Sequence, residues 1–328
     1  MSGMRVAVID DWQNVAAVST DWSGLKAKAE VVFFQRSFPE GAETDAVLLA
    51  DFDIILPMRE RSIFSAALLS RLPRLKMLSL TGMKAPNVDF TYCTTHGIVV
   101  SQAGSKTPAY AAEMALALML AAARRIPQAD ANMRAGRFQD GVGLGQVLRG
   151  KTLGIIGLGK IGTEVARFAQ ALGMRVLAWS QNLTAEKAEA AGGMFVEKNV
   201  LLAESDVVTL HLIFSERTRG IIGASELARM KEGAILVNTA RGPLVDEAAL
   251  LKALHENRIV AALDVYDEEP LPPSHPLRSA PNTVLSPHLG FSTSEVFGDF
   301  YKGAIENILA FLNGTPTRVA NPDVLKRA

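Results

Sequence analysis

The sequence predicts an α/β protein with two doubly wound parallel sheets, and three observations support this class. Short apolar runs typical of buried strands alternate with helical segments along most of the chain. A glycine-rich turn at residues 157–162 follows one such run and opens an amphipathic helix. The length of 328 residues allows two domains of ordinary size.

The composition excludes several classes of protein. Lys plus Arg and Asp plus Glu both number 34, so the basic surplus of proteins that bind nucleic acids or membrane surfaces is missing. Cys93 is the only cysteine, which rules out an intrachain disulfide and a cysteine-based zinc site, and we expect no metal. Residues 4–10 have a strand pattern rather than that of a signal peptide, and the apolar run 114–123 is too short to span a bilayer. We therefore predict a cytoplasmic protein with a small-molecule partner and no nucleic-acid or membrane partner.

The first hundred residues alternate strand and helix patterns, which predicts a small parallel sheet. We expect strands at 5–10, 53–56, 76–80 and 97–100, and helices around 42–49 and from near Ser62. The third strand runs into the loop Thr81-Gly82-Met83-Lys84. Ligands bind beyond the carboxyl ends of strands in open α/β sheets, so this loop is a candidate substrate site.

The longest helical pattern before the glycine turn covers residues 108–126, with Pro108 at a plausible first-turn position. It is apolar almost all round from 111 to 123, which indicates a helix buried in a core or a subunit interface. Residues 127–150 contain several glycines and are expected to form an irregular arm.

The glycine turn has the spacing and context of a dinucleotide-binding loop. Gly157 would allow a tight turn, Gly159 would let the backbone approach a pyrophosphate, and Gly162 would let helix and strand pack closely. The N-terminus of the following helix offers N–H groups and a positive dipole end to the phosphates. A bare turn is the alternative for this motif taken alone.

A second α/β unit begins at residue 152 and has the pattern of a dinucleotide-binding sheet. We expect strands at 153–156, 174–179, 206–210, 234–238, 259–264 and 283–286, and helices at 161–172, 184–191, 246–256 and 293–313. Ser180 directly follows the second of these strands, at the position where an Asp or Glu would bind the ribose 2′-hydroxyl of NAD. No arginine follows to hold a 2′-phosphate, so we predict NAD and leave NADP or dual use open.

Polar residues follow three later strands of the same predicted sheet. They are Arg241, Asp264 with Glu269 close behind it, and His288. Singly, each has an ordinary structural explanation, such as a surface ion pair, a solvated carboxylate or a structural imidazole. Because all of them fall at carboxyl ends of strands in one sheet, beside the cofactor crevice, we favour a catalytic role.

These residue types suit hydride transfer between a nicotinamide and a carbonyl group, which needs a proton donor for the developing alkoxide. His288 is the natural acid, and Glu269 would hold its tautomer and stabilise the protonated ring. Arg241 would bind a substrate carboxylate through two hydrogen bonds and polarise the carbonyl. Asp264 is better placed for the nicotinamide side of the cofactor.

The chain resembles the D-isomer-specific 2-hydroxyacid dehydrogenases over most of its length. The resemblance rests on four ordered motifs: Gly154-Ile155-Ile156-Gly157-Leu158-Gly159-Lys160-Ile161-Gly162, Val237-Asn238-Thr239-Ala240-Arg241-Gly242-Pro243-Leu244-Val245-Asp246, Ala262-Leu263-Asp264-Val265-Tyr266 with Glu269-Pro270, and Pro287-His288-Leu289-Gly290. The family's catalytic Arg, Glu and His fall on Arg241, Glu269 and His288.

The resemblance implies two Rossmann-like or flavodoxin-like domains with the active site in the inter-domain cleft. Residues 1–102 plus 295–328 would form the substrate domain, residues 103–294 would bind NAD(P), and a homodimer would form through the central domain. The implied cofactor-binding set is Gly157, Gly159, Lys160, Ile161, Gly162, Ser180, Thr239, Ala240, Arg241, Asp264, His288 and Thr107. The implied substrate-binding set is Arg59, Gly82, Met83, Lys84, Arg241 and His288.

Three departures from the family pattern bear on the substrate or on the domain content. Lys84 stands where glycine is common, and with Arg59 and Arg61 it either binds a second anionic group such as a phosphate or is an ordinary surface cation. Phe291 places an aromatic ring shortly after His288. The chain ends at Ala328, so we expect a short phosphoglycerate dehydrogenase-like form without the regulatory domain of longer relatives.

Two functions follow from these patterns. The first is an NAD(P)-dependent oxidoreductase that acts on the CH–OH group of a D-2-hydroxy acid and on the matching 2-keto acid, with a phosphorylated or otherwise doubly anionic substrate as one option. The second is a dimeric, dinucleotide-sensing regulator similar to the co-repressors of this fold, without significant turnover. The presence of Arg241, Glu269 and His288 favours the enzyme.

Overall fold

The structure is a computed structural model that describes residues 3–38, 43–83, 85–105 and 109–326. The chain forms two compact units. Unit 1 comprises Met1–Lys106 and Thr293–Ala328, and unit 2 comprises Thr107–Ser292. Each unit is built on a parallel sheet, which confirms the predicted α/β class.

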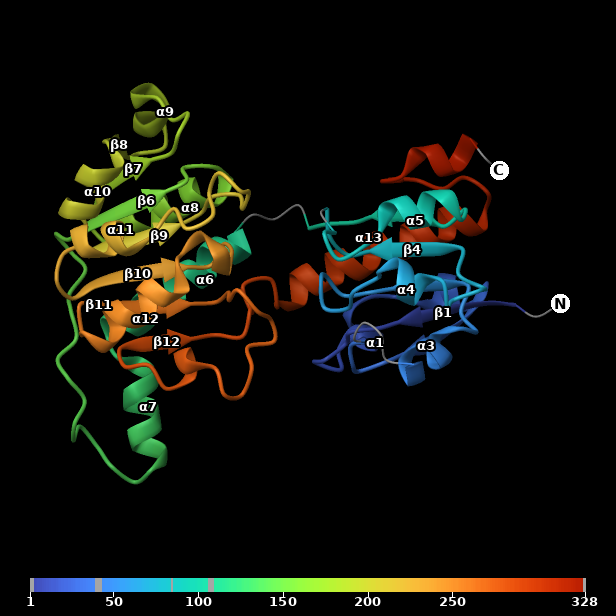
Figure 1. The fold of residues 1–328 in the computed structure, drawn as a ribbon, viewed down its shortest axis with the longest axis horizontal. Helices are drawn as coiled ribbons and strands as arrows, with labels where there is room; N and C mark the ends of the chain where they lie inside the picture. Colours follow the sequence, from blue (N-terminus) through green and yellow to red (C-terminus); the bar gives the residue numbers. More distant parts are fainter. Residues whose placement is uncertain (1–2, 39–42, 84, 106–108, 327–328) are drawn as a thin grey trace. The chain divides into compact units, whose positions relative to one another are not determined.

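Unit 1 contains a five-stranded sheet in the spatial order β2-β1-β3-β4-β5. The described strands are β1 (Met4–Val8), β2 (Ala29–Phe33), β3 (Ile54–Leu56), β4 (Met77–Leu80) and β5 (Val99–Gln102), drawn in blue to teal in Figure 1. β2 is an addition to the predicted strands. It lies at the sheet edge, and its apolar residues Val31, Val32 and Phe33 are only partly buried.

Two predicted strand limits in unit 1 are wrong for the same physical reason, a backbone in the left-handed region. The first strand ends at Val8 and not at residue 10, because Asp10 has a φ of +67°. The last begins at Val99 and not at residue 97, because Gly97 has a φ of +74°.

The described helices of unit 1 are short until the last one. They are α1 (Ala16–Ser19), α2 (Ser23–Lys26), α3 (Glu43–Leu49), α4 (Ala66–Leu69), α5 (Phe90–Thr95), α13 (Ser294–Leu312) and the 3₁₀ turn η3 (Pro322–Lys326). The predicted helix start near Ser62 is wrong. α4 begins at Ala66, where the side chain of Ser65 accepts a hydrogen bond from the Leu68 N–H.

Helix α13 packs against the sheet formed by the first hundred residues. The Ser79 hydroxyl on β4 donates to the Ala304 carbonyl at 3.0 Å, and the Asn307 side chain donates to the carbonyl of Gln102 at 3.1 Å. These bonds join the two ends of the chain within unit 1.

Unit 2 contains a seven-stranded sheet in the order β12-β11-β10-β9-β6-β7-β8 (Figure 1). The described strands are β6 (Thr152–Ile156), β7 (Arg175–Trp179), β8 (Met194–Phe195), β9 (Val207–Leu210), β10 (Ala234–Asn238), β11 (Ile259–Leu263) and β12 (Thr283–Leu285). Six of these match predicted strands to within one residue at each end. The two-residue edge strand β8 is too short to give a sequence signal.

The helices of unit 2 connect these strands and cover the sheet. Those described are α6 (Ala109–Ala123), α7 (Ile126–Arg134), α8 (Lys160–Ala171), α9 (Ala185–Ala190), α10 (Lys198–Glu204), α11 (Ala224–Arg229) and α12 (Glu247–His255), with 3₁₀ turns η1 (Gly242–Leu244) and η2 (Pro276–Arg278). The predicted irregular arm is wrong over α7, which starts with Pro127 in its first turn and ends before Gly136.

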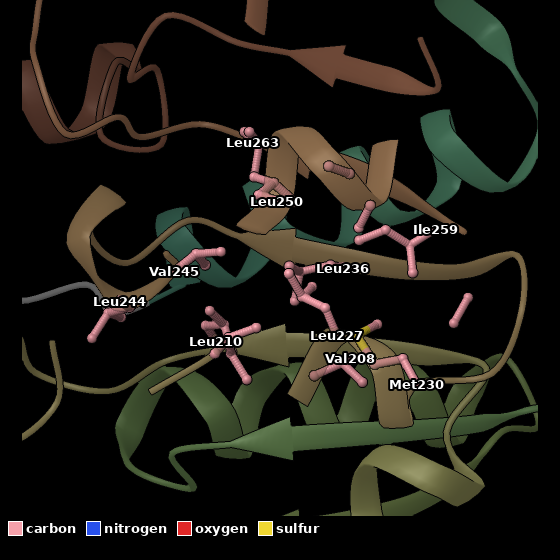
Figure 2. Packing of buried hydrophobic residues seen from close by; sticks show 14 of the residues in the cluster. Val208, Leu210, Leu227, Met230, Leu236, Leu244, Val245, Leu250, Ile259 and Leu263 are labelled. Carbon is pink, nitrogen blue, oxygen red and sulfur yellow. The ribbon is translucent and has the colours of Figure 1, made fainter. Parts of the chain in front are cut away.

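Apolar cores fill both faces of the unit 2 sheet. Buried residues of α6 and α8, such as Ala112, Leu118 and Val165, pack with Leu153 and Ile155 of β6. The other face packs against α10, α11 and α12. Figure 2 shows this second core, where Leu227 and Met230 around the end of α11 and Leu250 of α12 lie over strand residues. The central strands are therefore buried on both sides, which explains their near-continuous apolar sequences.

In each sheet, an aspartate at the amino ends of the strands forms bonds to neighbouring segments. Asp53 Oδ2 accepts the Arg5 backbone N–H at 3.1 Å and pairs with Lys76 at 3.0 Å. Asp206 Oδ2 accepts the Thr152 backbone N–H at 2.9 Å and pairs with Lys231 at 3.1 Å. Asp53 directly precedes β3, which pairs with β1, and Asp206 directly precedes β9, which pairs with β6, so the two units use the same stabilising contact. Across the described parts of the chain, no helix is long and apolar enough to cross a membrane.

Candidate active site

The glycine turn joins β6 to α8, and its three glycines meet different surroundings. Gly157 has a φ of +106°, and a Cβ there would lie 2.7 Å from the His211 carbonyl carbon. A Cβ on Gly162 would lie 2.4 Å from the Gly157 carbonyl oxygen. At Gly159 a Cβ would meet nothing within 4 Å. Two glycines are thus required by packing, and the third faces open space where a ligand could approach the backbone.

The N-terminus of α8 opens at this space. Gly159 is its N-cap residue and supplies no side-chain cap, and Lys160 and Ile161 are the first residues of the helix. Backbone N–H groups of a first helical turn suit the pyrophosphate of a dinucleotide. The residues present therefore fit the phosphate portion of NAD.

The carboxyl end of β7 lies beside the glycine turn, because Trp179 pairs in register with Ile156 of β6. Ser180 follows and is half-buried. The Lys198 ammonium lies 5.9 Å from the centroid of the Trp179 ring and is paired with Glu226 at 2.9 Å. Ser180 therefore occupies the position expected for the ribose partner without bringing a carboxylate there.

His211 is a residue at the cofactor edge that the sequence analysis does not include. It follows β9, contacts Gly157 through its backbone, and places Nε2 2.9 Å from the Thr209 hydroxyl. Burial lowers the pKa of His211 to about 4, so the ring is neutral at physiological pH. The signal that could have found it is the one used for His288, a polar residue directly after a buried strand.

Arg241 follows β10 in a loop that the side chain of Asn238 shapes. The Asn238 amide donates to the Arg241 carbonyl at 2.8 Å and accepts from the Ala240 N–H at 3.0 Å. Thr239, between them, is half-buried. The Arg241 side chain is exposed, and its Nη1 donates to the Ala240 carbonyl at 2.7 Å. Its guanidinium forms no ion pair with a described residue, so it is suited to meet an anionic ligand.

Asp264 directly follows β11 and is almost fully buried. Its Oδ1 accepts the Leu289 N–H and its Oδ2 accepts the Gly290 N–H, both at 2.8 Å. Burial raises the pKa of Asp264, against the lowering effect of these bonds. The carboxylate therefore anchors the loop that carries His288, a contact that the sequence analysis does not predict.

Glu269 and His288 form a direct pair. Glu269 Oε2 lies 2.5 Å from His288 Nδ1, and Oε1 accepts the Tyr266 backbone N–H at 2.9 Å. His288 has a φ of +55°, a conformation held by the loop around it. Both side chains are about one-third exposed, at 33% and 28%. With Nδ1 engaged, Nε2 has no hydrogen bond to a described residue and remains for proton exchange with a ligand. Phe291 packs edge-on against this imidazole at 5.6 Å.

Apart from Arg241 and His288, the predicted substrate residues that the structure describes lie in unit 1, after β3 and β4. Arg59 has a φ of +58°, donates its N–H to the Thr81 hydroxyl at 2.7 Å, and pairs with Glu60 at 3.3 Å. Gly82 and Met83 follow β4, with Met83 67% exposed. Lys84 and Thr107 lie outside the described residues.

Arg61 lies in the same loop as Arg59. Its Nη1 donates to the Asp10 carbonyl at 2.6 Å and to the Gln13 side chain at 3.0 Å, and the guanidinium lies 4.2 Å from the centroid of the Trp12 ring. Burial lowers the pKa of Arg61.

The predicted location of the active site in an inter-domain cleft stays a prediction.

The site in unit 2 can therefore bind a dinucleotide at one edge of the sheet and exchange a proton at the same edge. The glycine turn, Ser180, Arg241, Asp264 and His288 all follow strands of a single parallel sheet. Among the residues that the structure describes, no group of three or more His, Cys, Asp or Glu side chains could hold a metal ion.

Comparison with known proteins agrees with this arrangement. Residues 116–290 match the family model described as "D-isomer specific 2-hydroxyacid dehydrogenase, NAD binding domain". A glyoxylate reductase of Aeropyrum pernix is 42% identical over 268 residues, which cover 79% of this chain and 80% of the relative. A D-3-phosphoglycerate dehydrogenase of Archaeoglobus fulgidus is 41% identical over 264 residues, which cover 80% of this chain. That alignment spans only half of the longer relative, 50% of its length.

Solved structures give the same result. The crystal structure of a phosphoglycerate oxidoreductase from Vibrio cholerae superposes with a TM-score of 0.89 at 35% identity, covering 95% of this chain and 99% of the other. The relatives named here are dehydrogenases, reductases and oxidoreductases, so they support the enzymatic prediction and not the regulatory alternative. The chain therefore belongs to the D-isomer-specific 2-hydroxyacid dehydrogenases, with NAD as its cofactor.

Proposed function

We propose that this protein interconverts a 2-keto acid and the matching D-2-hydroxy acid. The observation that supports this reaction most strongly is the Glu269–His288 pair at 2.5 Å, at the same sheet edge as the glycine turn and Arg241. When bound, the nicotinamide supplies the hydride in one direction and accepts it in the other. Every other part of the reaction falls to side chains of this chain.

His288 is the acid and base of the proposed reaction. Glu269 holds Nδ1, so the proton exchanged with substrate is the one on Nε2. During reduction the protonated ring gives that proton to the carbonyl oxygen, which becomes the hydroxyl of the product. During oxidation the neutral ring takes the hydroxyl proton back. The carboxylate of Glu269 stabilises the charged ring in either direction.

Arg241 is the proposed anchor for the substrate carboxylate. A guanidinium matches a carboxylate with two parallel N–H···O bonds, which fixes the orientation of the adjacent carbonyl. The side chain of Asn238, the last residue of β10, holds the loop that carries Arg241 through two hydrogen bonds. The backbone of Arg241 is therefore fixed. The same positive charge stabilises the negative charge that develops on the carbonyl oxygen.

The substrate side chain is the part of the proposal that unit 1 would determine. Arg59 and Arg61 follow β3, where ligands of parallel sheets bind, and we propose this loop as the substrate end of the site. Arg59 is already paired with Glu60, which reduces the local positive field. A phosphorylated keto acid tested beside uncharged analogues decides whether a second anionic group is recognised.

We further propose a cytoplasmic homodimer. Large apolar side chains are exposed along one stretch of unit 2, from the end of α6 through α7 and the segment after it: Leu120, Ile126, Met133, Phe138, Leu144 and Val147. Clustered exposed apolar residues favour a protein interface over free solvent. The single buried cysteine, Cys93, suits a reducing compartment.

A panel of keto acids tests the proposed reaction. Purified protein is mixed with NADH or NADPH and with glyoxylate, hydroxypyruvate, pyruvate, phosphohydroxypyruvate or a bulkier 2-keto acid. We expect oxidation of NADH by at least one of them, with the D-isomer of the hydroxy acid as product. Failure of every acid to oxidise either cofactor would contradict the proposal.

A further inference from the structure

Tyr266 lies among the three segments that carry Arg241, Glu269 and His288. It follows β11 by three residues, and its ring is 8% exposed within the apolar core that α12 covers. None of the predicted roles includes it. Three separate contacts connect it to the site in unit 2.

The first contact reaches Glu269. The Tyr266 backbone N–H donates to Glu269 Oε1 at 2.9 Å, while Oε2 of the same carboxylate lies 2.5 Å from His288 Nδ1. The carboxylate thus bridges the Tyr266 backbone and the imidazole. Any shift of Tyr266 would move the oxygen that holds the ring.

The second contact reaches the loop of His288 from its start. The Tyr266 hydroxyl donates to the Ser286 carbonyl at 2.9 Å. The same carbonyl accepts the His288 backbone N–H at 3.1 Å. Asp264 holds the other side of this loop through Leu289 and Gly290, so the left-handed backbone of His288 is fixed from both directions. Burial raises the pKa of Tyr266 to about 12, which keeps the hydroxyl a donor across the working pH range.

The third contact reaches the loop of Arg241. A Cβ on Gly242 would lie 2.1 Å from the Tyr266 carbonyl carbon and 2.3 Å from its oxygen. The backbone directly after Arg241 is therefore seated against the backbone of Tyr266 with no room for a side chain.

We propose that Tyr266 is a positioning residue, which sets the His288 imidazole against Glu269 through its hydroxyl bond to Ser286 and its N–H bond to Glu269. The expected effect on kcat rests on the proposed function, whereas the expected effect on the position of the His288 imidazole does not. Tyr266 itself would touch neither substrate nor cofactor.

The Tyr266→Phe variant isolates the hydroxyl, because the ring and the backbone N–H remain. We expect kcat of keto-acid reduction to fall about tenfold, with the Kd for NADH changed by less than about twofold. In a Glu269→Gln background the same substitution should change kcat by less than about twofold, because residues that act through one another are not additive. Ser205→Ala is the matched control: it removes another buried hydroxyl that donates to a backbone carbonyl in unit 2, at 2.6 Å from Leu201 O, and should leave kcat unchanged.

A readout independent of turnover separates this inference from the proposed function. Nitrogen-15 spectra of labelled histidine, with His288 assigned through His288→Asn, report the Nδ1–H bonded to Glu269. We expect a protected Nδ1–H signal in the wild type and in Ser205→Ala, and a signal lost to solvent exchange in Tyr266→Phe. Absence of turnover in the wild type would refute the proposed function. The comparison of the His288 Nδ1–H signal between wild type and Tyr266→Phe would still test the role of Tyr266.

Three results would overturn the proposal: an unchanged kcat in Tyr266→Phe, an equal loss in the Glu269→Gln background, or an unaltered His288 signal. A lower melting temperature without these changes would mean that Tyr266 only stabilises the fold. If Tyr266→Phe does not fold, Tyr266→Met also lacks the hydroxyl and can refill the space of the ring, so the same measurements apply.

Discussion

Glu269 Oε2 lies 2.5 Å from His288 Nδ1, although η2, β12 and the loops around them separate the two residues in the chain. The pairing orients the imidazole and leaves Nε2 for proton exchange. It also places a carboxylate beside the ring that gives its proton to the substrate during reduction. The rate of reduction should therefore depend on Glu269.

Replacing Glu269 by Gln keeps the shape of the side chain and removes the charge. We expect kcat of reduction to fall by about one to two orders of magnitude, the range of a weakened general acid. The neighbouring Glu268 is exposed, so Glu268→Gln is the control with an unchanged kcat. Steady-state kinetics measure both variants, and equal kcat values would refute the pairing as a functional contact.

Arg241 should not tolerate lysine. A lysine keeps the charge but cannot make two parallel hydrogen bonds to a carboxylate. We expect KM for the keto acid to rise by about tenfold or more, the equivalent of about 1.4 kcal/mol, with NADH affinity little altered. Arg217→Lys, at an exposed position after β9, serves as the control. Steady-state kinetics check this prediction, and an unchanged KM and kcat would remove Arg241 from the site.

The two glycines that flank the start of α8 should respond differently to alanine. Gly162→Ala would press a methyl group against the Gly157 carbonyl at 2.4 Å, so the free energy of unfolding should fall by about 1–3 kcal/mol. Gly159→Ala has open space and a φ of −94°, so stability should hold while NADH binds about tenfold more weakly. Denaturant titration and fluorescence titration with NADH measure the two effects. Equal behaviour of the two variants would contradict the separate roles.

The Glu226 carboxylate should make the free energy of unfolding depend on pH in the acidic range. Burial alone would raise its pKa, but Lys198, Ser225 and the Gly223 N–H together lower it to about 2. Since the folded-state pKa lies below the ordinary value of 4.5, this contribution is complete above pH 4.5 and disappears as the pH falls toward 2.

The Glu226→Gln variant should therefore be less stable than the wild type by about 1–3 kcal/mol at pH 7, with the difference vanishing near pH 2. Glu256→Gln removes an exposed ion pair with Lys252 and should cost little at any pH. Urea titrations across this range measure both. A difference between Glu226→Gln and wild type that does not change with pH would argue against the ion pair as its source.

The sequence predicts the central elements of unit 2 well because their signals are local. Strand β10 has the predicted limits, and the glycine turn lies where its spacing indicates. Long amphipathic helices such as α13 are found to within one residue at each end. Two edge strands, β2 and β8, are absent from the predicted strands. β8 has only two residues, which is too short for a pattern, whereas β2 contains the apolar run Val31 to Phe33 and could have been found.

In the candidate site, too, the residues with a local sequence signal are predicted and the contacts without one are not. Polar residues after apolar strands indicate Arg241, Asp264 and His288, because parallel strands end at one edge of a sheet. The contacts of Asp264 with Leu289 and Gly290 could not be foreseen, since they depend on where a loop places its backbone N–H groups. The hydroxyl bond of Tyr266 to the Ser286 carbonyl is of the same kind, because nothing local in either segment specifies it.

Single-turnover oxidation of NADH by His288→Asn is the most direct test of the central claim, that His288 paired with Glu269 delivers the proton. Excess protein is mixed with NADH and the best keto acid of the panel, and nicotinamide absorbance is followed in time. A rate about two to four orders of magnitude below wild type, with the Kd for NADH unchanged, is the predicted result. A near-normal rate of hydride transfer in His288→Asn would contradict it.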